Sequence, residues 1–280
     1  MYLRSESSHN NNKNKLKSDW YVDFHNKKDL TELIHKIPDN NLFYPQTRII
    51  TQKDIIKSDD NIYFLKPDMG RRQESIKILN KETDITKSIH QHMIRNKYKT
   101  WLLQQAIDSY LIKIPNHQSL RKMCIRSYYY LNNLTKSGID AYIYPTVITT
   151  VFHKPFESYN DNKQNMCLNA QTLGEKKASN WLFDLKFLFP DDYENIFNQM
   201  KEILKKITEQ YYLKIKHVKE YKLQNIFGVD WILDTDKHLF LLEINNGPDI
   251  KFYDKIVNRD SLKSDIKKLK NGYTNKFVKV

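Results

Sequence analysis

The chain has 280 residues, of which 40% are hydrophobic and 12% aromatic, so it can bury the core of one large domain or two smaller ones. Its two cysteines provide no disulfide framework, and no apolar run approaches the ~20 residues that span a membrane. We therefore expect a cytoplasmic protein that does not cross a membrane. The net charge of +13 favours an acidic partner, such as nucleic acid, an anionic membrane surface or an acidic protein.

The N-terminal part of the chain predicts a tail followed by short elements. Residues 1–18 are polar and lack the apolar core of a secretory signal, so we expect a disordered tail. Residues 20–37 predict a short helix. Residues 42–51 predict an extended segment, because Pro45 disfavours a helix. Residues 61–67 predict a short apolar strand.

The middle of the chain is rich in strand-forming residues. A polar loop at residues 70–72 separates the first strand from a second strand at residues 75–79. Residues 101–107 are apolar and edged by glutamines, and residues 122–131 and 141–152 have a β-rich composition. No internal repeat or clear linker splits the chain into independent parts.

The longest helix is predicted over residues 200–222. Apolar residues recur there at three- and four-residue steps and form one stripe. The stripe consists of Leu204, Ile207, Tyr211, Ile215, Val218 and Tyr221. Most lysines of this segment lie off the stripe, so we interpret them as a solvated face rather than as a binding site.

Two apolar runs near the C-terminus predict a β-hairpin. They cover residues 228–234 and 238–250 and flank the turn-forming residues 234–237. A four-residue loop places Leu233 opposite His238. This register determines which polar side chains share a face of the hairpin.

The predicted register places Asp230 opposite Leu241. Because side chains alternate along a strand, Glu243 and Asn245 then share the face of Asp230. Asp230 and Glu243 become diagonal cross-strand neighbours, roughly 7–8 Å apart at Cα. Such a group of oxygens is repulsive unless a cation lies between its members, and hard oxygen ligands suit Mg²⁺. The alternative interpretation is a half-buried strand whose polar residues face water.

Five segments occur in the order found in the tubulin–tyrosine ligase-like family, which the chain resembles. The segments are FYPQT at residues 43–47, YFLKP at 63–67, LLQQAIDSYLI at 102–112, KMCIRSYYYL at 122–131, and FGVDWILD with HLFLLEINNGPDI at 227–250. MCLNAQ at residues 166–171 is a weaker sixth match. We expect most of the large N-terminal domain of the founding ligase to be absent from this chain.

The resemblance implies an α+β ATP-grasp fold, in which two α+β subdomains hold the nucleotide between their sheets. We expect an N-terminal remnant and the central subdomain over residues 19–112. Residues 113–280 would form the C-terminal subdomain with the metal-binding hairpin. The resemblance also implies a ligase that uses ATP and Mg²⁺ to join a small amino acid to an acidic protein, such as a tubulin tail, through an acyl phosphate.

The resemblance assigns nucleotide-binding roles to five residues. Lys66 would reach the phosphates from the end of its strand, and Gln104 would lie at the adenine hinge. Lys122 and Arg126 are four residues apart, which puts them on one face of a strand, and Arg126 would offer a planar fork to phosphate. Asn169 would contact phosphate or metal. The alternative for Lys66 is an ordinary surface lysine, and the alternative for Gln104 is a polar edge residue. Lys122 and Arg126 could instead form a solvated basic edge.

The resemblance assigns the metal to the hairpin. Asp230, Glu243 and Asn245 would hold Mg²⁺, which bridges the phosphates and neutralises their charge. Arg126, Glu243 and Asn245 are the expected catalytic residues, because this chemistry depends on positioning and on charge neutralisation.

Several positions depart from the motifs of the family. Cys124 stands where the family has an aspartate, Gln105 replaces a lysine, and Ala106 replaces a tyrosine. Thr150 falls where an arginine is expected, and the loop after Gly70 lacks a later glycine. These departures keep a second interpretation open, a catalytically inactive ATP-grasp protein that binds microtubules or another polyanion. A third interpretation is a nucleic-acid binder, against which the sequence shows no zinc-finger, basic-zipper or RNA-recognition signature.

Overall fold

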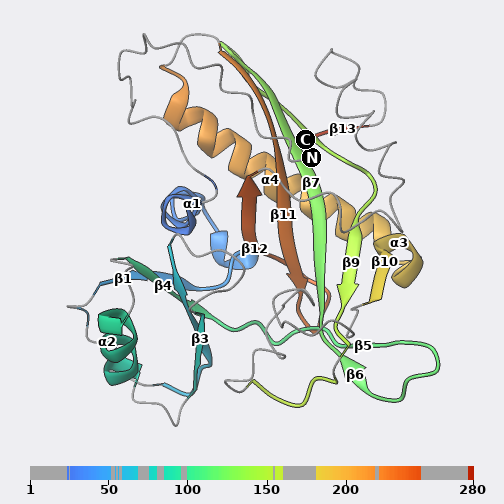
Figure 1. The fold of residues 1–280 in the computed structure, drawn as a ribbon. Helices are drawn as coiled ribbons and strands as arrows, with labels where there is room; N and C mark the ends of the chain where they lie inside the picture. Colours follow the sequence, from blue (N-terminus) through green and yellow to red (C-terminus); the bar gives the residue numbers. More distant parts are fainter. Residues whose placement is uncertain are drawn as a thin grey trace, which may run out of the picture.

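The described elements form an α+β fold with three antiparallel sheets, which confirms the predicted fold class. The computed structural model describes residues 24, 26–51, 54, 56, 59–68, 76–80, 85–95, 100–153, 155–159, 181–217, 221–246 and 277–280. Figure 1 shows a small sheet with one helix in the lower part of the view and a larger sheet with a long helix above it. None of the described helices is both long enough and apolar enough to cross a bilayer.

The small sheet has four strands in the order β1-β4-β2-β3. The strands are β1 (Thr47–Ile50), β4 (Trp101–Gln105), β2 (Tyr63–Pro67) and β3 (Lys77–Leu79). Side chains alternate along β2, so that Leu65 is buried against Ile89 and Met93 of helix α2 (Ile85–Arg95). The opposite face of β2 carries Phe64 and Lys66. Strands β2 and β3 were predicted from the sequence and β1 was predicted as extended, whereas β4 and α2 were not predicted.

The large sheet is built around two long strands, β7 (Met123–Thr135) and β11 (Tyr221–Leu233). The other strands are β8 (Gly138–Ile143), β9 (Ile148–Val151), β10 (Trp181–Asp184), β12 (Leu239–Asn246) and β13 (Val278–Lys279). The strand order is β10-β9-β7-β11-β12, with β8 pairing with both β7 and β13. A two-stranded ribbon, β5 (Ile112–Lys113) with β6 (Leu120–Arg121), precedes β7.

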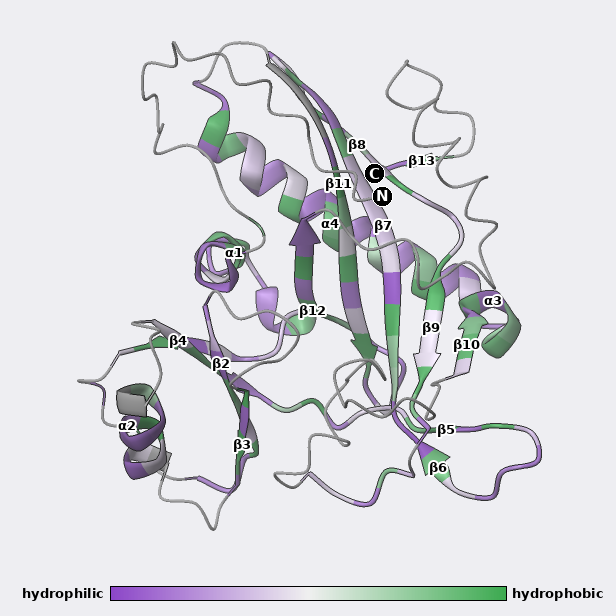
Figure 2. Ribbon diagram, viewed as in Figure 1, coloured by the Kyte–Doolittle hydropathy of each residue, from purple (hydrophilic) through white to green (hydrophobic). Residues whose placement is uncertain are grey.

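Helix α4 (Tyr193–Ile215) packs its apolar stripe on one face of the large sheet, beside the short helix α3 (Leu185–Leu188). Figure 2 shows hydrophobic and hydrophilic residues interspersed along α4, as expected for a helix with one buried side. The predicted span of residues 200–222 was wrong at both ends. The stripe begins earlier, with the buried Tyr193, and Tyr221 belongs to β11. Val218 lies outside the described residues.

Helix α1 (Lys27–Ile34) joins the two sheets and confirms the helix predicted over residues 20–37. Asn26 caps it, because its side chain accepts hydrogen bonds from the backbone N–H groups of Lys28 at 2.9 Å and Asp29 at 3.3 Å. The helix contacts β1 and β4 of the small sheet as well as β12 and α4. A short 3₁₀ turn (Asn40–Leu42) follows and leads into β1.

The hairpin of β11 and β12 exists as predicted, but its predicted register was wrong. Leu233 pairs with Leu239 rather than His238, because the turn is one residue longer and closes through a hydrogen bond from Asp234 N to His238 O at 3.0 Å. Lys237 takes a left-handed conformation in this turn, with φ of 64°.

A bulge at Leu242 then shifts the register a second time. Trp231 pairs with Leu241, but Asp230 pairs directly with Glu243, so the two acidic residues are opposite partners and not diagonal neighbours. Without the extra residue, strict alternation would pair Glu243 with Val229, whose side chain is in the core. The bulge therefore turns Glu243 away from the core and onto the face of Asp230.

Candidate active site

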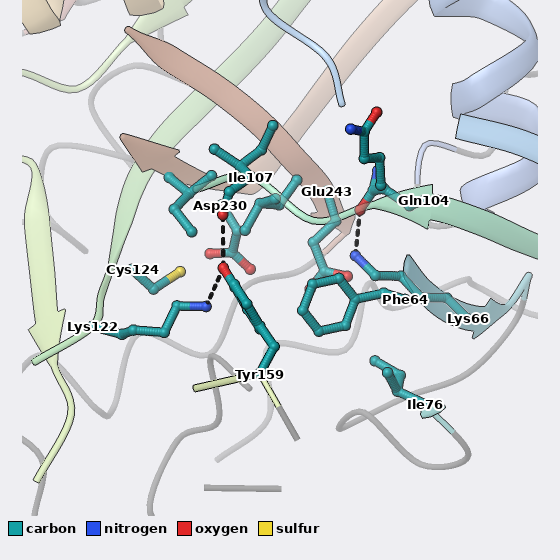
Figure 3. Close-up of a pocket in the computed structure, with 13 residues that line it drawn as sticks. Phe64, Lys66, Ile76, Gln104, Ile107, Lys122, Cys124, Tyr159, Asp230 and Glu243 are labelled. Atoms are coloured by element: carbon teal, nitrogen blue, oxygen red, sulfur yellow. Dashed lines mark hydrogen bonds between the residues drawn. The ribbon is translucent and has the colours of Figure 1, made fainter. Parts of the chain in front are cut away.

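A cleft lies between the small sheet and the large sheet. Its empty volume is about 720 Å³, a figure that includes space open to solvent. Apolar side chains line much of it, namely Phe64, Ile76, Ile107, Ile232 and Leu242. Figure 3 shows that polar side chains enter the cleft from both sheets.

The large sheet contributes a pair of carboxylates. Asp230 on β11 and Glu243 on β12 line the cleft as register partners. The side-chain amide of Asn245 joins them, because its Nδ2 donates to Asp230 Oδ2 at 3.0 Å and to Glu243 Oε1 at 2.9 Å. The structure thus brings together the three residues that the sequence predicted for the metal.

This arrangement has the donor set of a magnesium site. A positively polarised N–H group bridges the two carboxylates, at a position where a cation can bind both. With its amide turned over, Asn245 would present an oxygen there instead, and amide orientation follows the hydrogen-bond network. Carboxylate and amide oxygens are ligands that suit Mg²⁺. The residues present therefore fit this ion.

Arg126 on β7 holds Asp230 from the neighbouring strand. The two residues are partners in the β7–β11 register, and Arg126 Nε and Nη2 donate to Asp230 Oδ1 and Oδ2 at 2.6 Å and 2.5 Å. Such a two-point contact fixes the plane of the carboxylate as well as its position. Arg126 thus lies beside the carboxylate pair, with its fork bound to Asp230, and its predicted roles in nucleotide binding and catalysis stay a prediction.

The two carboxyl groups differ in acidity. Burial raises the pKa of Asp230 to about 6, an effect that the Arg126 guanidinium opposes and the Glu243 carboxylate reinforces. Burial acts in the same direction on Glu243, but the Lys27 ammonium and the hydrogen bond from Asn245 outweigh it and lower the pKa of Glu243 to about 2. Both groups are therefore ionised at neutral pH, and Asp230 takes up the first proton as the pH falls.

Cationic side chains face these carboxylates from outside the large sheet. Lys66 on β2 lines the cleft and donates to Gln104 Oε1 at 2.5 Å. Gln104 in turn donates to Thr47 Oγ1 at 3.0 Å, so its side chain orients Lys66 within the cleft. The sequence placed Gln104 at a hinge for adenine, and the structure places its amide against the lysine.

Lys27 is a site residue that sequence reasoning missed. Its Nζ lies 3.7 Å from Glu243 Oε2, and its position in the first turn of α1 brings it over the end of β12. Nothing in its spacing distinguishes Lys27 from the chain's many other lysines. Only the packing of α1 between the two sheets identifies it.

The other end of the cleft contains Lys122, Cys124 and Tyr159. Lys122 precedes β7 and is 4% exposed, and its Nζ donates to Tyr159 Oη at 2.9 Å. Lys122 and Cys124 line the cleft, and Arg126 follows on the same face, which agrees with the predicted alternation. Sequence reasoning missed Tyr159, which lies in a loop far along the chain. The predicted Asn169 and the loop of residues 70–72 lie outside the described residues.

The comparisons identify the family. A family model described as the tubulin-tyrosine ligase family matches residues 5–266, which is most of the chain. The chain belongs to the tubulin-tyrosine ligase family. Its α+β architecture agrees with the ATP-grasp-like fold of tubulin-tyrosine ligases, and membership supports a ligase-type enzyme. A search of curated proteins finds no match to this chain.

Proposed function

We propose that the protein is an ATP- and Mg²⁺-dependent ligase that joins an amino acid to a carboxylate or amine of an acidic protein. The observation that carries this proposal is the cleft itself. Cations from α1 and the small sheet face a carboxylate pair on the large sheet across a pocket with an apolar wall. A triphosphate with its metal needs charges of both signs in such an arrangement.

The charge balance of the cleft suits a metal-bound nucleotide. Among the described residues, four cations surround two carboxylates and leave a net positive charge; they are Lys27, Lys66, Lys122 and Arg126. This surplus of about two charges is similar in size to the negative charge of ATP bound to one Mg²⁺. We assign the metal to Asp230, Glu243 and the Asn245 amide oxygen, where it would neutralise charge on the phosphates.

The proposed reaction has two steps. A carboxylate oxygen of one substrate attacks the γ-phosphorus of ATP. The bond between that phosphorus and the bridging oxygen breaks, so that ADP leaves and an acyl phosphate forms. The amine of the second substrate then attacks the carbonyl carbon of the acyl phosphate, the bond from that carbon to the phosphate oxygen breaks, and inorganic phosphate leaves with the bonding electrons and takes the proton that the amine loses. Lys66 and Lys27 would position the phosphates, while Arg126 holds the Asp230 carboxylate in place for this chemistry.

Turnover in the presence of tubulin tests the proposal. The purified protein is incubated with Mg²⁺-ATP, tubulin and each labelled amino acid in turn, and ADP release and label on tubulin are both measured. We expect label to accumulate with one amino acid and in proportion to ADP. The proposal is contradicted if the protein does not bind ATP, whether Mg²⁺ or EDTA is present.

One observation favours a second candidate, a nucleotide-binding protein without turnover. Cys124 lines the cleft between Lys122 and Arg126, at the position where the resemblance implied an aspartate. A neutral thiol cannot bind a cation or a ribose hydroxyl as a carboxylate does. Mg²⁺-dependent ATP binding without ADP release, with any acceptor, would favour this candidate over the ligase.

A further inference from the structure

Tyr159 lines the same cleft as the carboxylate pair of β11 and β12. Its ring meets Phe64 of the small sheet edge-on, with centroids 5.8 Å apart, and the Lys122 ammonium lies 4.1 Å from the ring centroid on the other side. Figure 3 shows the side chain between Lys122 and Phe64. An aromatic side chain therefore fills space between the two walls that a planar ligand ring would use.

The hydroxyl group of Tyr159 is fully engaged with these walls. It donates to Ile107 O at 2.7 Å and accepts from Lys122 Nζ at 2.9 Å. Ser109 Oγ lies 3.0 Å from both the hydroxyl and Ile107 O. A carbonyl oxygen accepts two hydrogen bonds at most, so Tyr159 and Ser109 together can saturate Ile107 O.

The backbone beside Ile107 is also occupied. Gln105 N donates to Gln46 O at 2.8 Å, and Ala106 N donates to Ile62 O at 2.7 Å. The carbonyl of Ile107 is a hydrogen-bond acceptor and the ammonium of Lys122 is a donor, and the Tyr159 hydroxyl is bonded to both of them. An adenine edge offers the same polarity, with the N6 amino group as donor and N7 as acceptor.

We propose that Tyr159 occupies the position of the nucleotide base and must leave it before adenine can bind. The inference rests on the proposed function, because it takes the cleft to be a nucleotide site. Tyr159 competes with the base alone. The phosphates bind at the other end, beside Lys66 and Glu243, and are unaffected by the tyrosine.

The experiment compares two ligands that differ in the base. Calorimetry measures the affinities of Mg²⁺-ATP and Mg²⁺-tripolyphosphate for the unchanged protein, for Tyr159→Ala and for Tyr159→Phe. Tyr212→Phe is the matched control, since Tyr212 on α4 donates its hydroxyl to Lys136 O away from the cleft. Thermal unfolding of each variant checks that the fold is retained.

We expect Tyr159→Ala to bind ATP about tenfold more tightly, because two hydrogen bonds no longer compete with the base. Tyr159→Phe removes the same two bonds but keeps the ring, so its gain should be smaller. The affinity for tripolyphosphate should be the same in the unchanged protein and in every variant. Tyr212→Phe should bind both ATP and tripolyphosphate as the unchanged protein does.

Three results would overturn the proposal. The first is an ATP affinity that is unchanged or weaker in both Tyr159 variants, which would make the tyrosine part of the wall. The second is a parallel gain for tripolyphosphate, which would indicate a general opening of the cleft. The third is no binding of either ligand to any protein, which overturns the proposed function itself and this inference with it.

Discussion

Replacing Glu243 by glutamine should separate metal binding from folding. The substitution keeps the shape of the side chain and its contact with Asn245, but it removes one of the two charges proposed to hold Mg²⁺. Loss of residues that only support metal ligands typically costs 10- to 100-fold in affinity, so loss of a charged ligand should cost at least about 100-fold. This corresponds to about 2.7 kcal/mol of binding free energy.

The folded protein should tolerate the same change. The Glu243 side chain is 34% exposed, so its ion pair with Lys27 at 3.7 Å contributes only about 0–1 kcal/mol to the free energy of unfolding. Its repulsion with Asp230 disappears at the same time, which offsets part of that loss. Without metal, the melting temperature should therefore shift by no more than about 3 °C.

The loss of ATP affinity is measured by calorimetric titration of each protein with ATP, once in saturating Mg²⁺ and once in EDTA. Glu202→Gln is the control, because it makes the same chemical change at an exposed position on α4. The reasoning is refuted if Glu243→Gln binds ATP in Mg²⁺ within about threefold of the unchanged protein. It is also refuted if the unchanged protein binds ATP equally well in EDTA.

Three further predictions concern charge, two of them in the cleft and one over the whole chain. Burial raises the pKa of Asp230 to about 6, so this carboxylate loses its charge below that pH. The Mg²⁺-dependent affinity for ATP should therefore fall about tenfold per pH unit below pH 6. An affinity that does not change between about pH 7 and 5 would exclude Asp230 as a metal ligand. Lys66→Ala should weaken ATP binding by about 1–3 kcal/mol while the exposed Lys113→Ala leaves it unchanged, and an unaltered dissociation constant for Lys66→Ala would move the phosphate contact elsewhere. The net charge of +13 predicts that the protein binds microtubules and that this binding weakens steeply as salt is added. The reason is that surface charges are screened beyond about 8–10 Å near physiological ionic strength. Co-sedimentation that changes neither with salt nor with removal of the acidic tubulin tails would contradict this prediction.

The strands that build the cleft were predictable because their signals are local. Alternation in residues 61–67 and the turn residues at 234–237 each lie within a few positions of the strands they define. The same alternation placed Asp230, Glu243 and Asn245 on one face, and the structure confirms that they meet. Their roles in binding metal stay a prediction, as does the division of the chain at residue 112.

The exact register was not predictable, because it depends on packing across the sheet. Leu239, Leu241 and Ile244 are all in the core, and this set can be buried together only if Leu242 is extruded as a bulge. Lys27 and Tyr159 were missed for a related reason. Each enters the cleft from a segment far in sequence from its partners, and neither carries a local pattern that points there.

The position of α1 between the two sheets also has a consequence for how the protein folds. Lys27 and Glu243 come from opposite ends of the described chain, and β7 and Tyr159 come from its middle. Contacts between such distant segments close long loops, so they form late and slowly. The local strand pairs can form earlier, but the cleft has its full set of charges only once α1 has docked. A nucleotide that binds this cleft would therefore recognise the completed fold and stabilise it over partly folded states.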